Sequence, residues 1–103
     1  MPELTVPDAL AKLATEGSPD QIADHLLAEG YRGSRSQAAY CPVARYLRAI
    51  TGQSVAVCVF NWAVTGEAGW GRVPEPVSAF ITQFDEGWHS ALDIETAGVD
   101  EHV

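Results

Sequence analysis

The chain has 103 residues and a mass of 11.0 kDa, which is enough for one hydrophobic core and too little for two. Apolar residues make up 47% of the sequence, which excludes a disordered acidic chain, and two cysteines are too few for a disulfide scaffold. The formal net charge of −8 makes general nucleic-acid binding unexpected, because a polyanion is repelled at long range.

Two short helices are predicted before residue 31. The first runs from Val6 towards Gly17, with apolar residues at helical spacing on one face. The second begins with Ser18 as N-cap, a proline at the first helical position and Gln21 three residues after the cap, and it ends at Gly30. The connection between them is short, so we expect the two helices to pack as an antiparallel or steeply crossed pair.

Residues 31–40 predict a loop, because glycine and serine recur there. Cys41 and the proline after it open a third helix, which Gly52 closes. The apolar side chains of this helix share one face, and Arg45 and Arg48 point the opposite way.

A short β-hairpin is predicted after the third helix. Residues 54–60 are β-branched and apolar, which is typical of a strand, and residues 62–65 follow as a second strand. Three glycines surround Trp70 over residues 66–71, so we expect this tryptophan in a turn or an exposed loop.

A fourth, amphipathic helix follows residues 73–76 and ends at residues 85–87. From Asp93 onwards the chain is acidic and aperiodic. We therefore expect one small α+β domain over residues 1–92, with about four helices and a short β-hairpin, and an acidic, flexible C-terminal tail over residues 93–103.

The charge is divided unevenly among three parts of the chain. Residues 1–30 hold six acids and one lysine, and residues 73–103 hold seven acids and no base. Residues 31–72 hold five arginines and one acid, so a basic middle lies between acidic flanks. Guanidinium groups suit carboxylates and phosphates. These arginines either pair with the flanks of their own chain or meet an anionic ligand or partner.

The sequence predicts a cytoplasmic protein without a metal or cofactor. Its first thirty residues lack the basic start and apolar run of a signal peptide, and no apolar stretch approaches the ~18 residues of a membrane span. We therefore expect the thiols to be reduced. The three histidines are scattered and show no metal-ligand spacing.

Cys41 is the first candidate site. A thiol at a helix start feels the positive end of the helix dipole, and Arg45 lies one turn away, so both favour a thiolate. This pattern suits a nucleophile or a redox sensor. The alternative is a small cysteine that caps the helix and packs. No catalytic constellation is complete in the sequence, so we do not expect an enzyme.

The second candidate site is a group of four arginines: Arg32, Arg35, Arg45 and Arg48. The first two lie in the loop and the others on the outer face of the helix that follows. A loop leading into a helix N-terminus can bind an anion, and Gly33 would allow its close approach. The alternative is a set of solvated arginines paired with acids of the same chain.

Two tryptophans form a third candidate, a partner surface. Trp62 and Trp70 lie on a glycine-rich segment and could offer an exposed contact area. The alternative places Trp62 over the core and leaves Trp70 as the exposed member of the pair.

The chain resembles small acidic proteins of actinobacteria and their phages, which are similar in their Gly-x-x-Gly, Cys-Pro-x-Ala-x-Tyr-Leu and Phe-Asp-x-Gly motifs. The matching segments are Gly30-Tyr31-Arg32-Gly33, Cys41-Pro42-Val43-Ala44-Arg45-Tyr46-Leu47 and Phe84-Asp85-Glu86-Gly87. The resemblance extends over residues 22–88 and carries over no catalytic residue. It implies a lineage-restricted accessory protein of the kind that mobile elements encode.

We expect a non-enzymatic binding or regulatory protein that acts through a protein partner or as a homodimer, in which the acidic flanks of one copy meet the basic middle of another. One alternative is an anion-binding or phosphate-ligand-binding module built on the arginines. A second is a thiol-dependent enzyme or sensor built on Cys41. A third is an acidic nucleic-acid mimic that inhibits a DNA-binding protein, which needs its acids arrayed on one exposed face.

Overall fold

The computed structural model describes residues 5–34, 38–66 and 69–93. Within these ranges, four α-helices and a three-stranded antiparallel sheet form one small domain, which confirms the predicted α+β class. The elements in chain order are α1 (Val6–Ala14), α2 (Pro19–Ala28), α3 (Pro42–Thr51), β1 (Val55–Val57), β2 (Asn61–Val64), β3 (Trp70–Arg72), α4 (Glu75–Asp85) and a 3-10 turn, η1 (Ser90–Leu92).

The helix ends follow local signals in the sequence. The predicted N-cap Ser18 accepts a hydrogen bond from the Gln21 N–H at 3.2 Å. Each of the four helices carries a proline in its first two positions, where the missing N–H removes no helical hydrogen bond. The α3 helix ends at Gly52, whose φ of 74° is the left-handed conformation that glycine adopts without strain.

The sheet has one strand more than the predicted hairpin. β2 lies in the middle, with Trp62 opposite Val57 of β1 and opposite Gly71 of β3. The prediction of a loop around Trp70 is therefore wrong, because Trp70 begins β3. At Gly71 the absence of a side chain serves a close approach, since a Cβ there would lie 2.8 Å from the Trp62 indole.

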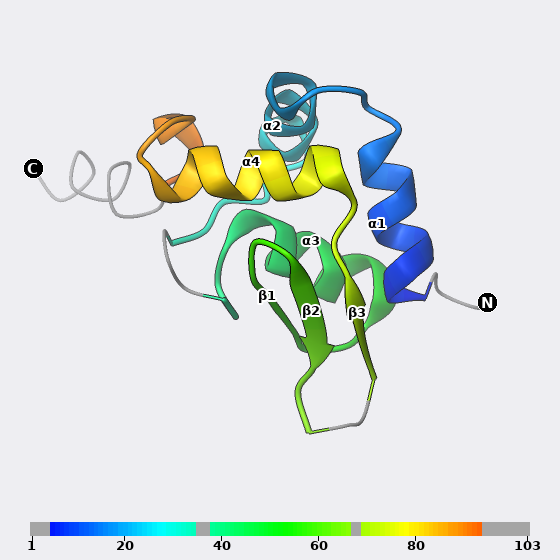
Figure 1. Cartoon of the computed structure of the whole chain (residues 1–103). Coiled ribbons are helices and arrows are strands. Elements are labelled where there is room, and N and C mark those ends of the chain that lie inside the picture. Colours follow the sequence, from blue (N-terminus) through cyan, green and yellow to red (C-terminus); the bar gives the residue numbers. More distant parts are fainter. Residues whose placement is uncertain (1–4, 35–37, 67–68, 94–103) are drawn as a thin grey trace, which may run out of the picture.

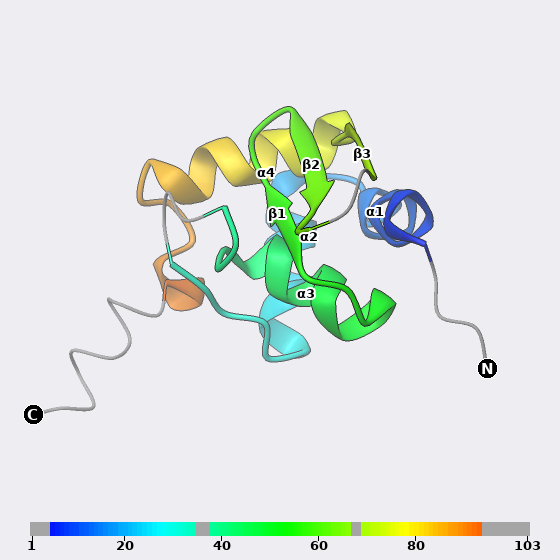
Figure 2. The ribbon, with the colours of Figure 1, turned by 90° about the horizontal axis from the view of Figure 1, so that it is seen from below.

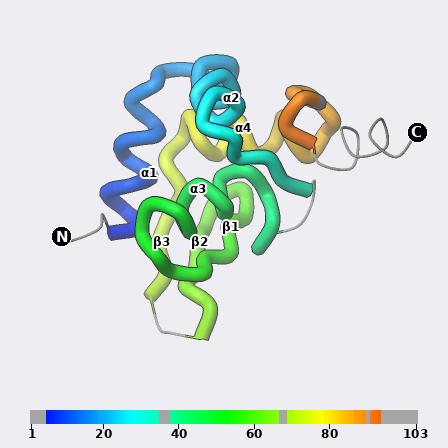
Figure 3. Tube along the Cα trace, turned by 180° about the vertical axis from the view of Figure 1, so that it is seen from behind, coloured from blue at the N-terminus to red at the C-terminus, as the bar shows by residue number. Residues whose placement is uncertain are grey.

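The helices cover one face of the sheet. Figures 1 and 3 show α3 against that face, while α4 crosses above the strands and packs on α2 and α1. The side chains of the covered face are buried, whereas Asn61 and Ala63 on the opposite face are exposed. In Figure 2, no described element lies over that opposite face. The largest fully buried side chains are Phe80, Phe84, Leu10, Leu13, Ile22, Leu26, Leu47 and Leu92.

The described chain ends in a folded turn. The predicted tail begins at Asp93, yet this residue is only 2% exposed and forms a parallel bridge with Gly33. Residues 94–103 of the predicted tail lie outside the described residues. None of the helices in the described ranges has the length and apolar character of a membrane span.

Tyr46 joins α3 to α1 by a buried hydrogen bond. Its hydroxyl donates to the Ala9 carbonyl at 2.8 Å, and its ring meets that of Tyr31 edge to face at 5.8 Å between centroids. Burial raises the pKa of Tyr46 above its usual value. The neutral hydroxyl therefore contributes stability below pH ~10, and this contribution is lost as the pH rises through the raised pKa of the folded state.

We expect Tyr46→Phe to lower the free energy of unfolding by about 1 kcal/mol at neutral pH, because the hydrogen bond to Ala9 is lost while the ring is kept. Urea unfolding measures this change. Tyr40→Phe is the matched control: Tyr40 is 52% exposed, so the effect should stay within about 0.5 kcal/mol. Equal effects of the two variants would contradict the role of Tyr46.

Candidate functional site

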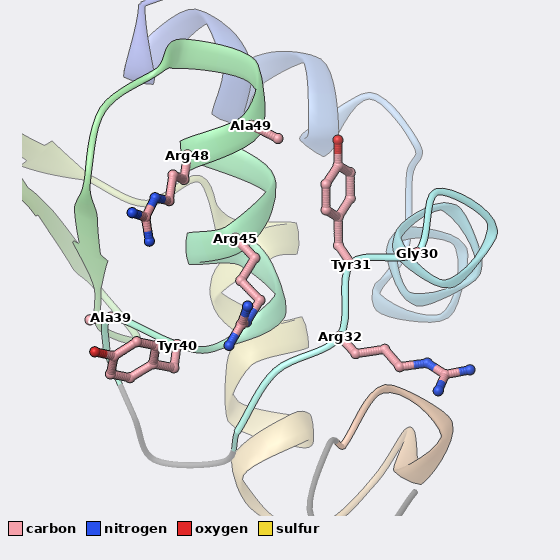
Figure 4. Close-up of a pocket in the computed structure, with 8 residues that line it drawn as sticks. All are labelled: Gly30, Tyr31, Arg32, Ala39, Tyr40, Arg45, Arg48 and Ala49. Atoms are coloured by element: carbon pink, nitrogen blue, oxygen red, sulfur yellow. The ribbon is translucent and has the colours of Figure 1, made fainter. Parts of the chain in front are cut away.

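A pocket of about 460 Å³ lies between the segment that follows α2, the residues that precede α3, and the outer side of α3 (Figure 4). We call it the arginine pocket. Its lining residues are Gly30, Tyr31, Arg32, Ala39, Tyr40, Arg45, Arg48 and Ala49. The structure thus brings together three of the four predicted arginines, and Arg35 lies outside the described residues.

The helical spacing of α3 places its two arginines at the pocket. Val43 and Leu47 are fully buried, which fixes the apolar face of α3 against the core. Arg45 and Arg48, three residues apart, then project from the outer side as neighbours. This part of the site could be predicted from sequence, because amphipathic spacing alone determines it.

Two tyrosines border the arginines, and the sequence analysis missed both. The Tyr40 ring centroid lies 5.9 Å from the Arg45 guanidinium carbon, a cation–π distance. Tyr31 stands across the pocket, on the segment after α2 (Figure 4). A signal was present in the sequence, since the two tyrosines are the first and last residues of the arginine-bearing loop.

The pocket arginines have no counter-ion in the described part of the chain. The ion pairs found there join His25 to Glu16 at 3.6 Å and His89 to Asp20 at 3.9 Å, and neither includes an arginine. Arg45 and Arg48 are both exposed. Pairing with the acidic flanks, one of the two interpretations of the basic middle, is therefore not found for these arginines within the described residues.

Arg32 lines the pocket in a different way. Figure 4 shows its guanidinium pointing away from Arg45 and Arg48, so the three groups do not converge on one point. The pocket therefore offers two arginines from neighbouring positions of α3, with Arg32 at its border.

Gly33 serves the fold rather than a ligand. Its N–H donates to the Leu92 carbonyl at 2.9 Å, and the next N–H, of Ser34, donates to the Tyr40 carbonyl at 2.8 Å. A Cβ on Gly33 would overlap backbone atoms of residues 40–42. The close approach that glycine permits is thus to its own chain, and the expected approach of an anion at Gly33 is wrong.

The N-terminus of α3 is not open to an anion either. The Cys41 sulfur accepts a hydrogen bond from the Ala44 N–H at 3.3 Å, and Pro42 has no N–H to offer. Residues 41–44 are all buried. The arginine pocket therefore lies along the side of α3, and the predicted site at the helix N-terminus is corrected accordingly.

Cys41 caps α3 and packs in the core, as the second of its two interpretations predicted. It is 4% exposed. Burial raises the pKa of the thiol from 9.0 to about 11, and the charge of Asp85 adds to this rise, whereas the N–H groups of Ala44 and Val43 act in the opposite direction. Desolvation outweighs the helix terminus, so the expectation of a stabilised thiolate is wrong.

The two candidate tryptophans are separated by the pleat of the sheet. Trp62 is 7% exposed and belongs to the core, whereas Trp70 is 69% exposed. This confirms the interpretation that places Trp62 over the core and leaves Trp70 as the exposed tryptophan of the pair. Phe60 and Trp88 are also exposed, and the sequence analysis did not single them out as surface aromatics.

No protein-family model, curated protein or solved structure matches this chain significantly. The resemblance to actinobacterial and phage proteins therefore stays a prediction. Within residues 5–34, 38–66 and 69–93, no group of three or more His, Cys, Asp and Glu residues is placed to hold a metal ion.

We expect Gly33→Ala to lower the free energy of unfolding by roughly 3 kcal/mol, because the new methyl group meets backbone atoms that cannot move aside. Gly30→Ala is the comparison: nothing lies within 4 Å of its Cβ position, and only the positive φ of 84° opposes alanine, at about 1 kcal/mol. Urea unfolding of both variants tests the order. A milder effect at Gly33 would contradict the close approach.

We expect an alkylating reagent at neutral pH to modify the exposed Cys58 quickly and Cys41 slowly. Mass spectrometry gives both rates, and Cys58→Ser isolates the rate of Cys41. Equal alkylation rates would refute burial of the thiol.

The raised pKa of Cys41 also makes stability depend on pH. Because the pKa in the folded state is about 11, the contribution of the buried thiol to stability is present below pH ~9 and is lost as the pH rises towards 11.

Proposed function

We propose that this chain is a small non-enzymatic binding protein that recognises an acidic segment of a protein partner at the arginine pocket. The observation that carries the proposal is the pair Arg45 and Arg48, exposed on one side of α3 beside Tyr40, without a counter-ion among the described residues. A regulatory role, as the sequence predicts, would act through this contact.

The chemistry of the pocket favours carboxylates. Each guanidinium is a planar fork that can donate two parallel hydrogen bonds to one carboxylate. Arg45 lies against the Tyr40 ring, and this contact restricts the side chain before a ligand arrives. Less conformational entropy is then lost on binding. Two neighbouring forks suit a segment with two acidic residues close together.

The charge of the rest of the protein favours one orientation of the acidic partner at the arginine pocket. The net charge is −8, and 13 of the 14 acidic residues lie in the parts of the chain before and after the basic middle. An acidic partner is repelled by those parts and attracted only near the arginines, which fixes its register. The same total charge opposes nucleic acid.

A phosphate-bearing small ligand is the second candidate. A volume of about 460 Å³ lies within the range of small-molecule pockets, roughly 300–1,000 Å³. The Tyr40 ring lies beside Arg45, and Tyr31 lines the pocket on its other side. The nucleic-acid mimic stays a prediction.

The non-enzymatic part of the proposal rests on the state of the reactive side chains. Cys41 is buried. His25 pairs with Glu16 and packs against the Tyr46 ring, and His89 lies 2.8 Å from the Gln83 side-chain oxygen. These contacts are structural, and none of these residues lines the arginine pocket. The exposed free thiol of Cys58 suits the reducing cytoplasm that we propose for the protein.

We expect a short glutamate-rich peptide, titrated at low salt, to shift the NMR signals of Tyr31, Tyr40, Arg45 and Arg48. The double variant Arg45→Glu/Arg48→Glu should weaken binding by about 10-fold or more, because charge-assisted hydrogen bonds are replaced by repulsion. Arg72→Glu is the matched control for the single variant Arg45→Glu, since it makes the same charge change outside the pocket and should have little effect. Higher salt should weaken binding.

A parallel titration with inorganic phosphate separates the two candidates. Binding of phosphate without binding of the peptide would favour the small-ligand function. If neither ligand binds at low salt, or if the double variant binds as tightly as the native chain, the arginine pocket is not the recognition site.

A further inference from the structure

The outer edge of β3 is left unpaired by the residues that the structure describes. The strand order is β1-β2-β3, so β1 and β3 are the two edges of the sheet. The β1 edge is partly covered, because the Val57 N–H donates to the Ala38 carbonyl at 2.8 Å. No described residue pairs with the outer edge of β3, which Figure 1 shows at the side of the sheet away from β1.

The bonding groups at this edge follow from the strand register. The Val64 N–H donates to Gly69 and the Val73 N–H to Phe60, on either side of the pair formed by Trp62 and Gly71. Bonding direction alternates along an antiparallel strand, so Gly71 faces β2. Trp70 and Arg72 therefore turn both their N–H and their C=O groups towards the open edge.

The side chains of the same two residues lie on the uncovered face of the sheet. Trp70 is opposite Ala63 and Arg72 is opposite Asn61, and all four are exposed. Arg72 has no ion pair within the described residues. An unpaired sheet edge is a template for strand pairing with another chain.

We propose that β3 pairs in antiparallel fashion with β3 of a second copy, about a two-fold axis at Gly71. In this register Trp70 of each copy faces Arg72 of the other copy, and their open N–H and C=O groups bond to each other. The two glycines meet at the axis as a non-hydrogen-bonded pair, in which opposite Cα atoms come closest.

The register itself favours a second copy over an unrelated strand. A guanidinium stacks well on an indole face, and the symmetric pairing forms that contact twice without any change of sequence. An axis at Arg72 would instead place two arginines opposite each other. The axis at Gly71 also sets the whole of each three-residue strand opposite its copy.

The pairing should be weak. Three residues span about 10 Å, so the buried area is below that of a stable dimer and a weak, reversible association is expected. Both copies carry a net charge of −8, and salt, which screens this repulsion, should strengthen association. This salt dependence is opposite to that expected for the arginine pocket.

Sedimentation velocity over a wide range of protein concentration tests the pairing. We expect a monomer–dimer equilibrium that Trp70→Arg weakens by about 10-fold, because arginine then faces arginine. The double variant Trp70→Arg/Arg72→Trp exchanges the two residues and should restore association, since the same contact reforms across the axis. Trp88→Ser removes another exposed tryptophan, beyond the far end of α4, and should change nothing.

Amide hydrogen exchange, followed by NMR, locates the contact. With rising concentration, the amides of Trp70 and Arg72 should become protected, while that of Gly71, already bonded to β2, should not change. The proposal is overturned if the protein stays monomeric, if the exchanged double variant fails to associate, or if these two amides stay unprotected in the dimer. Association that Arg45→Glu abolishes and salt weakens would also overturn it, because the arginine pocket would then be the contact.

Discussion

The backbone contact at Gly33 is the constraint on which the rest of the site depends. The segment after α2 lies so close to the start of α3 that no side chain fits between them. Hydrogen bonds from Gly33 to Leu92 and from Ser34 to Tyr40 hold this approach. Because Tyr31 and Tyr40 lie on the two arms of this crossing, the contact determines where both rings stand beside the arginines of α3.

The two sides of α3 differ in their exposure to solvent, and each side carries one of the candidate sites. Its start and inner side are buried, and burial raises the pKa of the Cys41 thiol to about 11, which favours the protonated form at neutral pH. Its outer side leaves Arg45 and Arg48 exposed beside the pocket. The same helix therefore buries the candidate thiol of Cys41 and exposes the two arginines. Desolvation and exposure, rather than residue type, decide which candidate can meet a ligand.

Local signals predicted much of this fold, and the failures occurred where distant segments meet. Ser18 caps α2 as expected, because an N-cap needs only residues close in sequence. The third strand was missed because Gly71 looks like a turn residue until Trp62 is placed against it. The pKa of Cys41 depends on burial, which helix position does not reveal. The position of Arg45 and Arg48 on the same side of α3 could be predicted from helical spacing. The positions of Tyr31 and Tyr40 could not, because they depend on the backbone contact at Gly33.

The bond between Gly33 and Leu92 also has a consequence for the order of folding. It joins residues that are separated by most of the domain, and contacts of such long sequence separation form late. During synthesis α1, α2 and α3 emerge well before η1, so the bond from Gly33 to Leu92 cannot form until Leu92 has left the ribosome. The nascent chain therefore carries Arg45 and Arg48 before this bond can form, and the proposed recognition requires the closed domain.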